Sequence, residues 1–166
     1  FPTRRSSDLI SSGFNWGYKK TSQKNSYIAY NEICENMKLL YDGAGIYTLG
    51  LQPGTVINNN YIHHVKNAHG LYTDEGSQEI LFEDNIIYDV GDCSYQHHHG
   101  HSNIFRNNIF ADARVNYIRR LREDEKQSFW MDRNIFWITG GRVLNGTWSN
   151  GFYKFTKNIY WITRGA

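Results

Sequence analysis

Apolar and polar positions recur along the chain about every two dozen residues. The clearest copy is Ile80 to Tyr88 (ILFEDNIIY), in which an asparagine has an apolar residue three places before it and another two places after it. The six copies carry their asparagines at Asn31, Asn60, Asn85, Asn108, Asn134 and Asn158, with gaps of 29, 25, 23, 26 and 24 residues. A period in this range is typical of a solenoid, whose repeats bury their apolar faces only against their neighbours.

The repeats predict strands rather than helices. Around each asparagine the apolar residues alternate or form short runs rich in Ile, Phe, Tyr and Trp, separated by Asn, Asp, Gly and Ser. We therefore expect an all-β, right-handed parallel β-helix of about five to six coils, one coil per repeat. The asparagine suits a turn between two strands because it tolerates left-handed backbone angles. Stacked copies can also form a ladder of side-chain amides.

The two ends of the chain do not follow the repeat. Residues 1–9 (FPTRRSSDL) resemble a translated sequencing adapter, and we expect them to be an artefact preceding a fragment of a longer domain. Residues 10–26 are expected to form a loop or a partial coil. The β-helix repeats are expected over 27–166, with a charged insertion at about 112–127 that forms a short helix or an overhanging loop.

Composition excludes some functions. The formal net charge is only +2, so charge gives no reason to expect a nucleic-acid partner. No run approaches 18 apolar residues, so no membrane span is expected. Aromatic residues make up 16% of the chain and suit the flat apolar faces of sugars, although they can equally fill the coils. The two cysteines, Cys34 and Cys93, occupy different repeat positions, and we expect no disulfide between them.

A second strand in each repeat predicts a surface site. In three successive repeats a tyrosine lies ten residues before the apolar residue that precedes the asparagine; these tyrosines are Tyr47, Tyr72 and Tyr95. Since neighbouring coils stack about 4.8 Å apart, the three rings are expected to form one outward column that binds substrate. The next outward column is expected to contain Leu49, Asp74 and His97, and Glu123 extends it if the same offset holds.

Carboxyl groups beside these columns are the candidates for catalysis. Hydrolysis of a sugar bond uses two carboxyls, about 5 to 5.5 Å apart for retention or about 6.5 to 9.5 Å apart for inversion. Asp74 is the first choice because it is expected in mid-sheet, facing outward. Glu75 follows it before Gly76, where the chain can turn. Asp42, one coil earlier, is the alternative partner, although an aspartate there also suits a turn.

All seven histidines lie between His63 and His101. The HHHGH run suggests a metal site, because His97, His99 and His101 share one face of an extended strand and imidazole binds zinc. No further ligand is placed to complete such a site, so no metal is expected there. We expect His97 and His98 instead to hydrogen-bond substrate and to influence Asp74 and Glu75.

The segments GIYTLGLQPGTVINNNYIHHV, HGLYTDEGS, YQHHHG and NIFRNNIF resemble bacterial right-handed β-helix proteins of carbohydrate-active type, in particular glycoside hydrolase family 141. The resemblance covers Ile28 to Ala111. It implies a secreted or periplasmic protein that acts on plant or algal polysaccharides through acidic residues on the sheet surface. At matching positions it points to Asp74 and Glu75, with His97 and His98 beside them.

Three functions remain open from the sequence. The first is a glycoside hydrolase that uses Asp74 with Glu75 or Asp42. The second is a polysaccharide lyase in which His97 removes a proton next to a uronate carboxylate, with calcium as a cofactor in that case. The third is a non-catalytic protein that binds glycan on its tyrosine column. A polysaccharide or oligosaccharide is the expected partner in each case, and the protein is expected to be a monomer without other cofactors.

Overall fold

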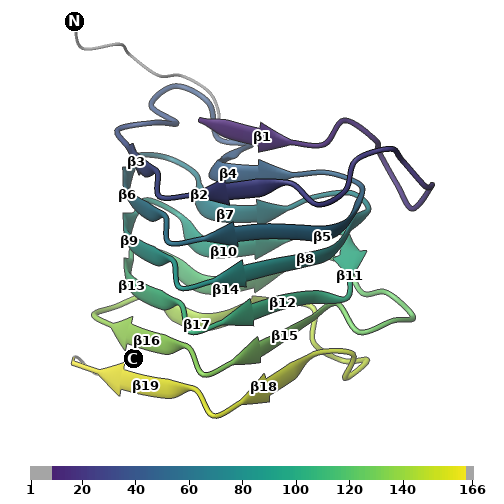
Figure 1. Cartoon of the computed structure of the whole chain (residues 1–166). Coiled ribbons are helices and arrows are strands. Elements are labelled where there is room, and N and C mark those ends of the chain that lie inside the picture. Colours follow the sequence, from purple (N-terminus) through teal and green to yellow (C-terminus); the bar gives the residue numbers. More distant parts are fainter. Residues whose placement is uncertain (1–8, 164–166) are drawn as a thin grey trace, which may run out of the picture.

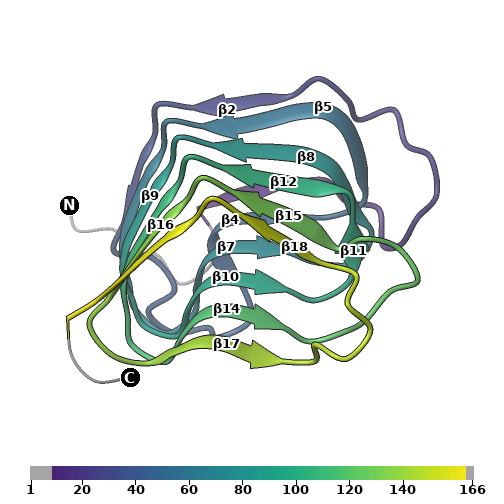
Figure 2. The same cartoon turned by 90° about the horizontal axis from the view of Figure 1, so that it is seen from below.

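The computed structural model describes residues 9–163, and between them it contains strands but no helix. The strands stack in parallel, as predicted, and they lie on three faces, with the chain winding from one face to the next in every coil (Figure 1). Seen along the stack, the three sheets enclose a single core (Figure 2). The predicted parallel β-helix of five to six coils is confirmed. None of the described residues forms a helix able to cross a membrane.

Each sheet takes one strand from almost every coil. Sheet 1 contains β1 (Ile10–Ser12), β4 (Ala44–Thr48), β7 (His69–Thr73), β10 (Cys93–His97), β14 (Asn116–Arg120) and β17 (Arg142–Gly146). Sheet 2 contains β2 (Tyr27–Ala29), β5 (Leu51–Asn58), β8 (Ser77–Glu83), β12 (Asn103–Arg106), β15 (Phe129–Asp132) and β18 (Lys154–Thr156), and β11 (Gly100–His101) also pairs with β8. Sheet 3 contains β3 (Glu32–Cys34), β6 (Tyr61–Val65), β9 (Ile86–Val90), β13 (Ile109–Ala113), β16 (Ile135–Ile138) and β19 (Ile159–Ile162).

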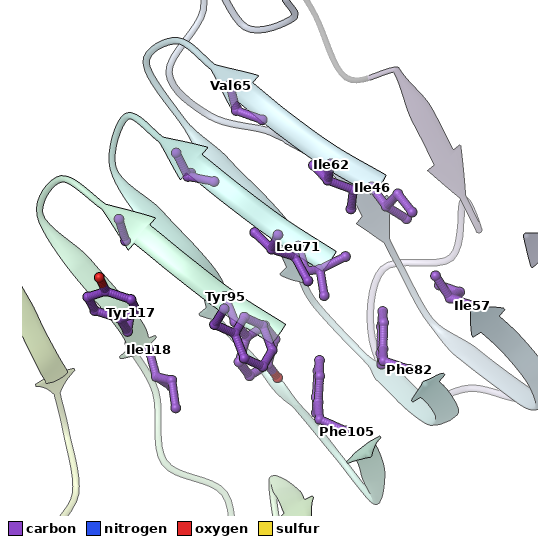
Figure 3. Packing of buried hydrophobic residues seen from close by; sticks show 14 of the residues in the cluster. Ile46, Ile57, Ile62, Val65, Leu71, Phe82, Tyr95, Phe105, Tyr117 and Ile118 are labelled. Atoms are coloured by element: carbon purple, nitrogen blue, oxygen red, sulfur yellow. The ribbon is translucent and has the colours of Figure 1, made fainter. Parts of the chain in front are cut away.

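The core consists of columns of like side chains. Figure 3 shows Ile57, Phe82 and Phe105 at equivalent places of successive coils. The rings of Phe82 and Phe105 stack with centroids 4.4 Å apart and planes 2° from parallel. Such stacking follows from the parallel register, which places equivalent residues directly above one another. Burial of these columns against the neighbouring coils is the main stabilisation expected in a solenoid.

The six repeat asparagines form the predicted ladder between sheets 2 and 3. Each side-chain amide donates to Oδ1 of the next asparagine at 2.9 to 3.1 Å, from Asn31 as far as Asn158. The expectation that these asparagines adopt left-handed angles is wrong. The residue immediately before each of them has the positive φ, as at Asp84 (55°) and Asn107 (55°). This turn residue frees the following asparagine to point its amide along the stack.

The ends of the described chain differ from the regular coils. Residues 1–8, which contain most of the expected artefact, lie outside the described residues. β1 pairs with β4 and so begins sheet 1, and residues 13–26 form a long loop, which we call the N-terminal loop. The segment expected as a charged insertion includes the regular strand β14, which pairs with both β10 and β17, and only the residues after it form a loop. Cys34 and Cys93 are both free.

Candidate functional site

The outward column of sheet 1 differs from the predicted one in its third coil. Tyr47 pairs with Tyr72 as expected, but Tyr72 pairs with Gln96, and Tyr95 pairs with Leu71. Tyr95 is therefore in the core, where its hydroxyl lies 2.8 Å from that of Thr73 and its ring packs on the core phenylalanines (Figure 3). The prediction of Tyr95 as a surface residue that binds substrate is wrong.

The length of one turn explains this error. Ten residues separate Tyr72 from Phe82, but only nine separate its pairing partner Gln96 from Phe105, the partner of Phe82. Ten residues before Phe105 is Tyr95, whereas the residue that faces outward in this coil is its neighbour Gln96. A shift of one residue transfers each side chain of a strand to the opposite face of the sheet.

The prediction that His97 faces outward is wrong for the same reason. His97 pairs with Thr73, faces the core and is fully buried. Burial lowers the pKa of its imidazole to about 3, so the ring is neutral at ordinary pH. Its Nδ1 lies 3.4 Å from the hydroxyl of Thr73. His97 cannot contact a substrate on the outer face, and His98 occupies the outward position that was predicted for His97.

Glu123 does not extend the column either. The segment after β14 is two residues longer than the corresponding segment after β7. Arg119 pairs with Gln96 in the outward column, and twelve residues separate it from Met131, compared with ten from Tyr72 to Phe82. Glu123 lies in the loop after this strand, where it accepts hydrogen bonds from the backbone N–H groups of Ser149 and Asn150 and pairs with the buried Arg120. This carboxylate therefore links the loop after β14 to the loop after β17 and does not point into the predicted site.

The other six predicted site residues lie together. They line one cleft of about 360 Å³ on the outer side of sheet 1, which we call the Asp74 cleft. Its lining consists of Trp16, Asp42, Tyr47, Leu49, Tyr72, Asp74, Glu75 and His98. All three carboxyl groups predicted to be catalytic are among these residues, together with two of the three tyrosines and one of the two histidines.

Asp74 is the most firmly held acid in the cleft. It follows β7, and its backbone N–H donates to the carbonyl of Thr48 at 3.0 Å, which continues the sheet pairing by one residue. Its Oδ2 accepts a hydrogen bond from the hydroxyl of Tyr47, and its Oδ1 lies 2.5 Å from Nδ1 of His98. Only 8% of the side chain is exposed. Both carboxylate oxygens are therefore oriented by neighbours in adjacent coils.

The two tyrosines form the wall beside Asp74. Their rings meet edge to face with centroids 5.1 Å apart. Burial, followed by the nearby carboxylate of Asp74, raises the pKa of both phenols well above the usual range, so both hydroxyls stay protonated as hydrogen-bond donors. Gln96 continues this outward column in the next coil, where Arg119 donates to its side chain at 3.0 Å.

The N-terminal loop, expected from the sequence as a loop or a partial coil, completes the cleft. Its aromatic residues Phe14, Trp16 and Tyr18 are a signal of this in the sequence. The backbone N–H of Gly17 donates to the carbonyl of Glu75 at 3.5 Å, and the hydroxyl of Tyr18 donates to Asp124, on the loop after β14. These contacts place the indole of Trp16 at the cleft, where it remains 67% exposed. A residue far from Asp74 in the sequence thus presents a free aromatic face to whatever enters the cleft.

Two other hollows have fewer reactive groups. One over sheet 3 is lined by Asp112, Trp137, Thr139 and Thr163, and so contains a single carboxyl group. Another, beside Phe14 and Leu49, has no acidic or basic side chain in its lining. Several acids, a histidine and aromatic rings therefore converge in the Asp74 cleft and in neither of these two hollows, which makes it the candidate active site.

Comparison with protein families matches residues 8–145 to the right-handed β-helix region. No curated protein and no solved structure matches the chain significantly. The family match covers more than half of the chain and agrees with the parallel stacking of the three sheets. This fold is common among enzymes that degrade polysaccharides, but the fold alone does not define an activity. On the family match and the observed architecture together, the chain belongs to the right-handed β-helix family.

Proposed function

We propose that this protein hydrolyses glycosidic bonds of a neutral polysaccharide in the Asp74 cleft. The observation that carries the proposal is the convergence of three carboxyl groups with free aromatic surface in one open cleft. Glycoside hydrolysis uses a pair of carboxyls, one as acid and one as base or nucleophile. Aromatic rings such as that of Trp16 offer a flat apolar surface on which a sugar ring can stack.

Asp74 suits the role of base or nucleophile. Tyr47 and His98 hold its two oxygens, so the carboxylate keeps one orientation while substrate binds. A fixed reacting group lowers the entropic cost of reaching the transition state. The acid that protonates the leaving oxygen is then Glu75 or Asp42, which line the same cleft and are more exposed than Asp74.

The charge of the cleft supports a neutral substrate. Three acids line it, and its lining includes neither lysine nor arginine. A chain of uronic acids would bring further negative charge into a partly buried acidic site, where like charges repel more strongly than in water. A neutral glycan avoids this repulsion and still uses the hydrogen-bonding groups and the aromatic surface.

One observation supports a second candidate, a polysaccharide lyase. The contact between Asp74 and Nδ1 of His98 fixes the imidazole, and donation through Nδ1 leaves Nε2 as a base. In β-elimination, Nε2 would take the proton from the carbon beside the uronate carboxylate, and the electrons of that C–H bond would form a double bond to the adjacent carbon. The glycosidic oxygen would leave that carbon with its bonding electrons and take a proton from water. Such a substrate would need a cation, for example calcium, between its carboxylate and the acids of the cleft.

The test is an assay of the purified chain on neutral polysaccharides and on polyuronates. Hydrolysis releases reducing ends without ultraviolet absorbance, whereas elimination yields an absorbing unsaturated product. We expect Asp74→Asn to lower hydrolysis roughly 100- to 10,000-fold. Glu75→Gln and Asp42→Asn identify the acid, since only the acid's replacement should cause a comparable loss.

Asp84→Asn is the matched control. It makes the same chemical change at an exposed turn with φ of 55°, a backbone conformation that asparagine tolerates, outside the cleft lining. Its activity should equal that of the unmodified chain. Binding of a glycan without any product would refute the hydrolase and favour a binding protein. An unsaturated product that is lost in His98→Gln would favour the lyase.

A further inference from the structure

A second group of reactive side chains lies on a different face, the outer side of sheet 3. Glu32 and Cys34 belong to β3, and His63 belongs to the adjacent β6. Cys34 and His63 are direct partners in the strand pairing. One ligand atom from each of the three residues lies within 4.8 Å of the other two. No histidine of the HHHGH run, where the sequence suggested a metal site, takes part.

Strand alternation brings these three side chains together. Ile33 and Ile62 lie beside them in the two strands, are fully buried and point into the core. Their neighbours Glu32, Cys34 and His63 must therefore point outward. The ring of Tyr61 stacks on that of His63 with centroids 4.2 Å apart, and it covers one face of the imidazole.

We propose that Glu32, Cys34 and His63 form a zinc-binding site. A thiolate, an imidazole and a carboxylate are the three ligand types that zinc accepts in proteins. Tetrahedral zinc with bonds of about 2.0 to 2.3 Å sets its ligand atoms roughly 3.3 to 3.6 Å apart. His63 Nε2 and Glu32 Oε1 are already 3.1 Å apart, close to the separation of two ligand atoms on zinc, and the Glu32 side chain is exposed and free to rotate.

The charges of the group also suit a divalent cation. With Cys34 as thiolate, Glu32 as carboxylate and His63 neutral, the ligands carry two negative charges. A zinc ion would cancel them and relieve the repulsion between the two anions. Three protein ligands leave the fourth position of a tetrahedral ion open toward solvent, as in zinc sites that bind water or an external ligand.

The other ring nitrogen of His63 has a hydrogen-bonding partner, which in turn lies near an acid. Its Nδ1 lies 2.5 Å from Nδ1 of His64, and Nε2 of His64 lies 3.5 Å from Oδ2 of Asp89. Without metal, Nε2 of His63 donates to the carboxylate of Glu32 at 3.1 Å; where zinc takes the place of that proton, Nδ1 of His63 donates to His64 and the Nε2 lone pair binds the ion. Outer partners that fix the tautomer in this way are a regular feature of zinc-binding histidines. The left-handed backbone of His64, with φ of 52°, turns its side chain to the same surface.

Zinc at this position would join two coils. β3 is a three-residue strand at the edge of sheet 3, paired only with β6 among the described strands. The ion would bridge β3 to β6 through side chains in addition to their backbone pairing. Because a ligand that binds only the folded form stabilises it, zinc should raise the melting temperature of the chain.

The test is a titration of the full chain with cobalt(II), which replaces zinc and is visible in absorption spectra. We expect a thiolate-to-cobalt charge-transfer band and tetrahedral visible bands at one equivalent of metal, both abolished by added zinc. Cys34→Ser should remove the charge-transfer band, and His63→Gln should remove tight binding. His64→Gln, which removes only the outer partner, should weaken the metal affinity roughly 10- to 100-fold.

Two controls make the result decisive. Glu35→Gln removes a neighbouring exposed carboxylate that pairs with Lys38 and is outside the ligand group, so it should bind cobalt like the unmodified chain. Cys93→Ala removes the other, fully buried thiol and should keep the charge-transfer band. Absence of that band from the unmodified chain, or its survival in Cys34→Ser, would overturn the proposal.

Discussion

Removal of one central rung of the asparagine ladder should destabilise the protein strongly. The side chain of Asn85 is fully buried. It donates to the carbonyl of Ile57 at 2.8 Å and to Oδ1 of Asn108 at 2.9 Å. Its own Oδ1 accepts from the backbone and the side chain of Asn60 at 3.0 and 2.9 Å. Asn85→Ala removes all of these hydrogen bonds.

The magnitude follows from the number of bonds lost. At about 1 kcal/mol for each hydrogen bond, Asn85→Ala should lower the free energy of unfolding by about 4 kcal/mol. The backbone N–H of Asn60 contributes most, because its acceptor disappears while the group stays buried. Asn31→Ala is the matched control at the end of the ladder. Asn31 is half-buried, and its side chain donates only to Ala29 and Asn60, so the expected cost is about 1 to 2 kcal/mol.

Urea unfolding, followed by circular dichroism, measures the difference between the two variants. With a slope of about 2 kcal/mol/M, the midpoint should fall by about 2 M for Asn85→Ala and by less than about 1 M for Asn31→Ala. Hydrogen exchange at the amide of Asn60 should accelerate in Asn85→Ala. Equal midpoints for the two variants, with unchanged exchange at Asn60, would refute the idea that the ladder stabilises the coil stack.

Three further changes test other parts of the structure. His97 is buried as the neutral form with a pKa of about 3, so below about pH 6.5 protons bind the unfolded chain in preference to the folded one. The contribution of His97 to the free energy of unfolding should therefore fall by about 1.4 kcal/mol for each pH unit down to about pH 3. His97→Leu should remove this part of the pH dependence, measured as urea midpoints between about pH 7 and 5. An identical slope in both proteins would contradict the burial of this ring. Gly76→Ala should detach the N-terminal loop, since φ is 78° and an added Cβ would lie 1.9 Å from the carbonyl oxygen of Gly17. Limited proteolysis should then cut that loop faster, whereas Gly151→Ala, with φ of 71° and open space around it, should leave the cleavage rate unchanged. If the protein is a hydrolase as proposed, Trp16→Ala should raise KM roughly 10-fold with little change in kcat, because it removes a binding surface and no reacting group. An unchanged KM would show that the indole does not contact the substrate.

The sequence predicted the repeat and the ladder because both depend on local spacing. An apolar residue three places before each asparagine and another two places after it define the inward positions of two strands, whatever the length of the remaining coil. It also identified Asp74, Glu75, Asp42 and Tyr72 as neighbours, since the first two coils that form the cleft keep the same count from tyrosine to core residue. The roles of these residues in catalysis remain predictions.

Turn lengths and long-range contacts were decided only in the tertiary structure. One residue fewer after β10 moves Tyr95 and His97 into the core and His98 into the cleft, because side chains alternate between the two faces of a strand. A fixed offset cannot detect such a change. Contacts of the N-terminal loop bring Trp16 to the cleft, and strand pairing brings Cys34 to His63. Spacing along the chain thus determined which residues face inward within a coil, whereas the lengths of the turns determined which residues of different coils meet.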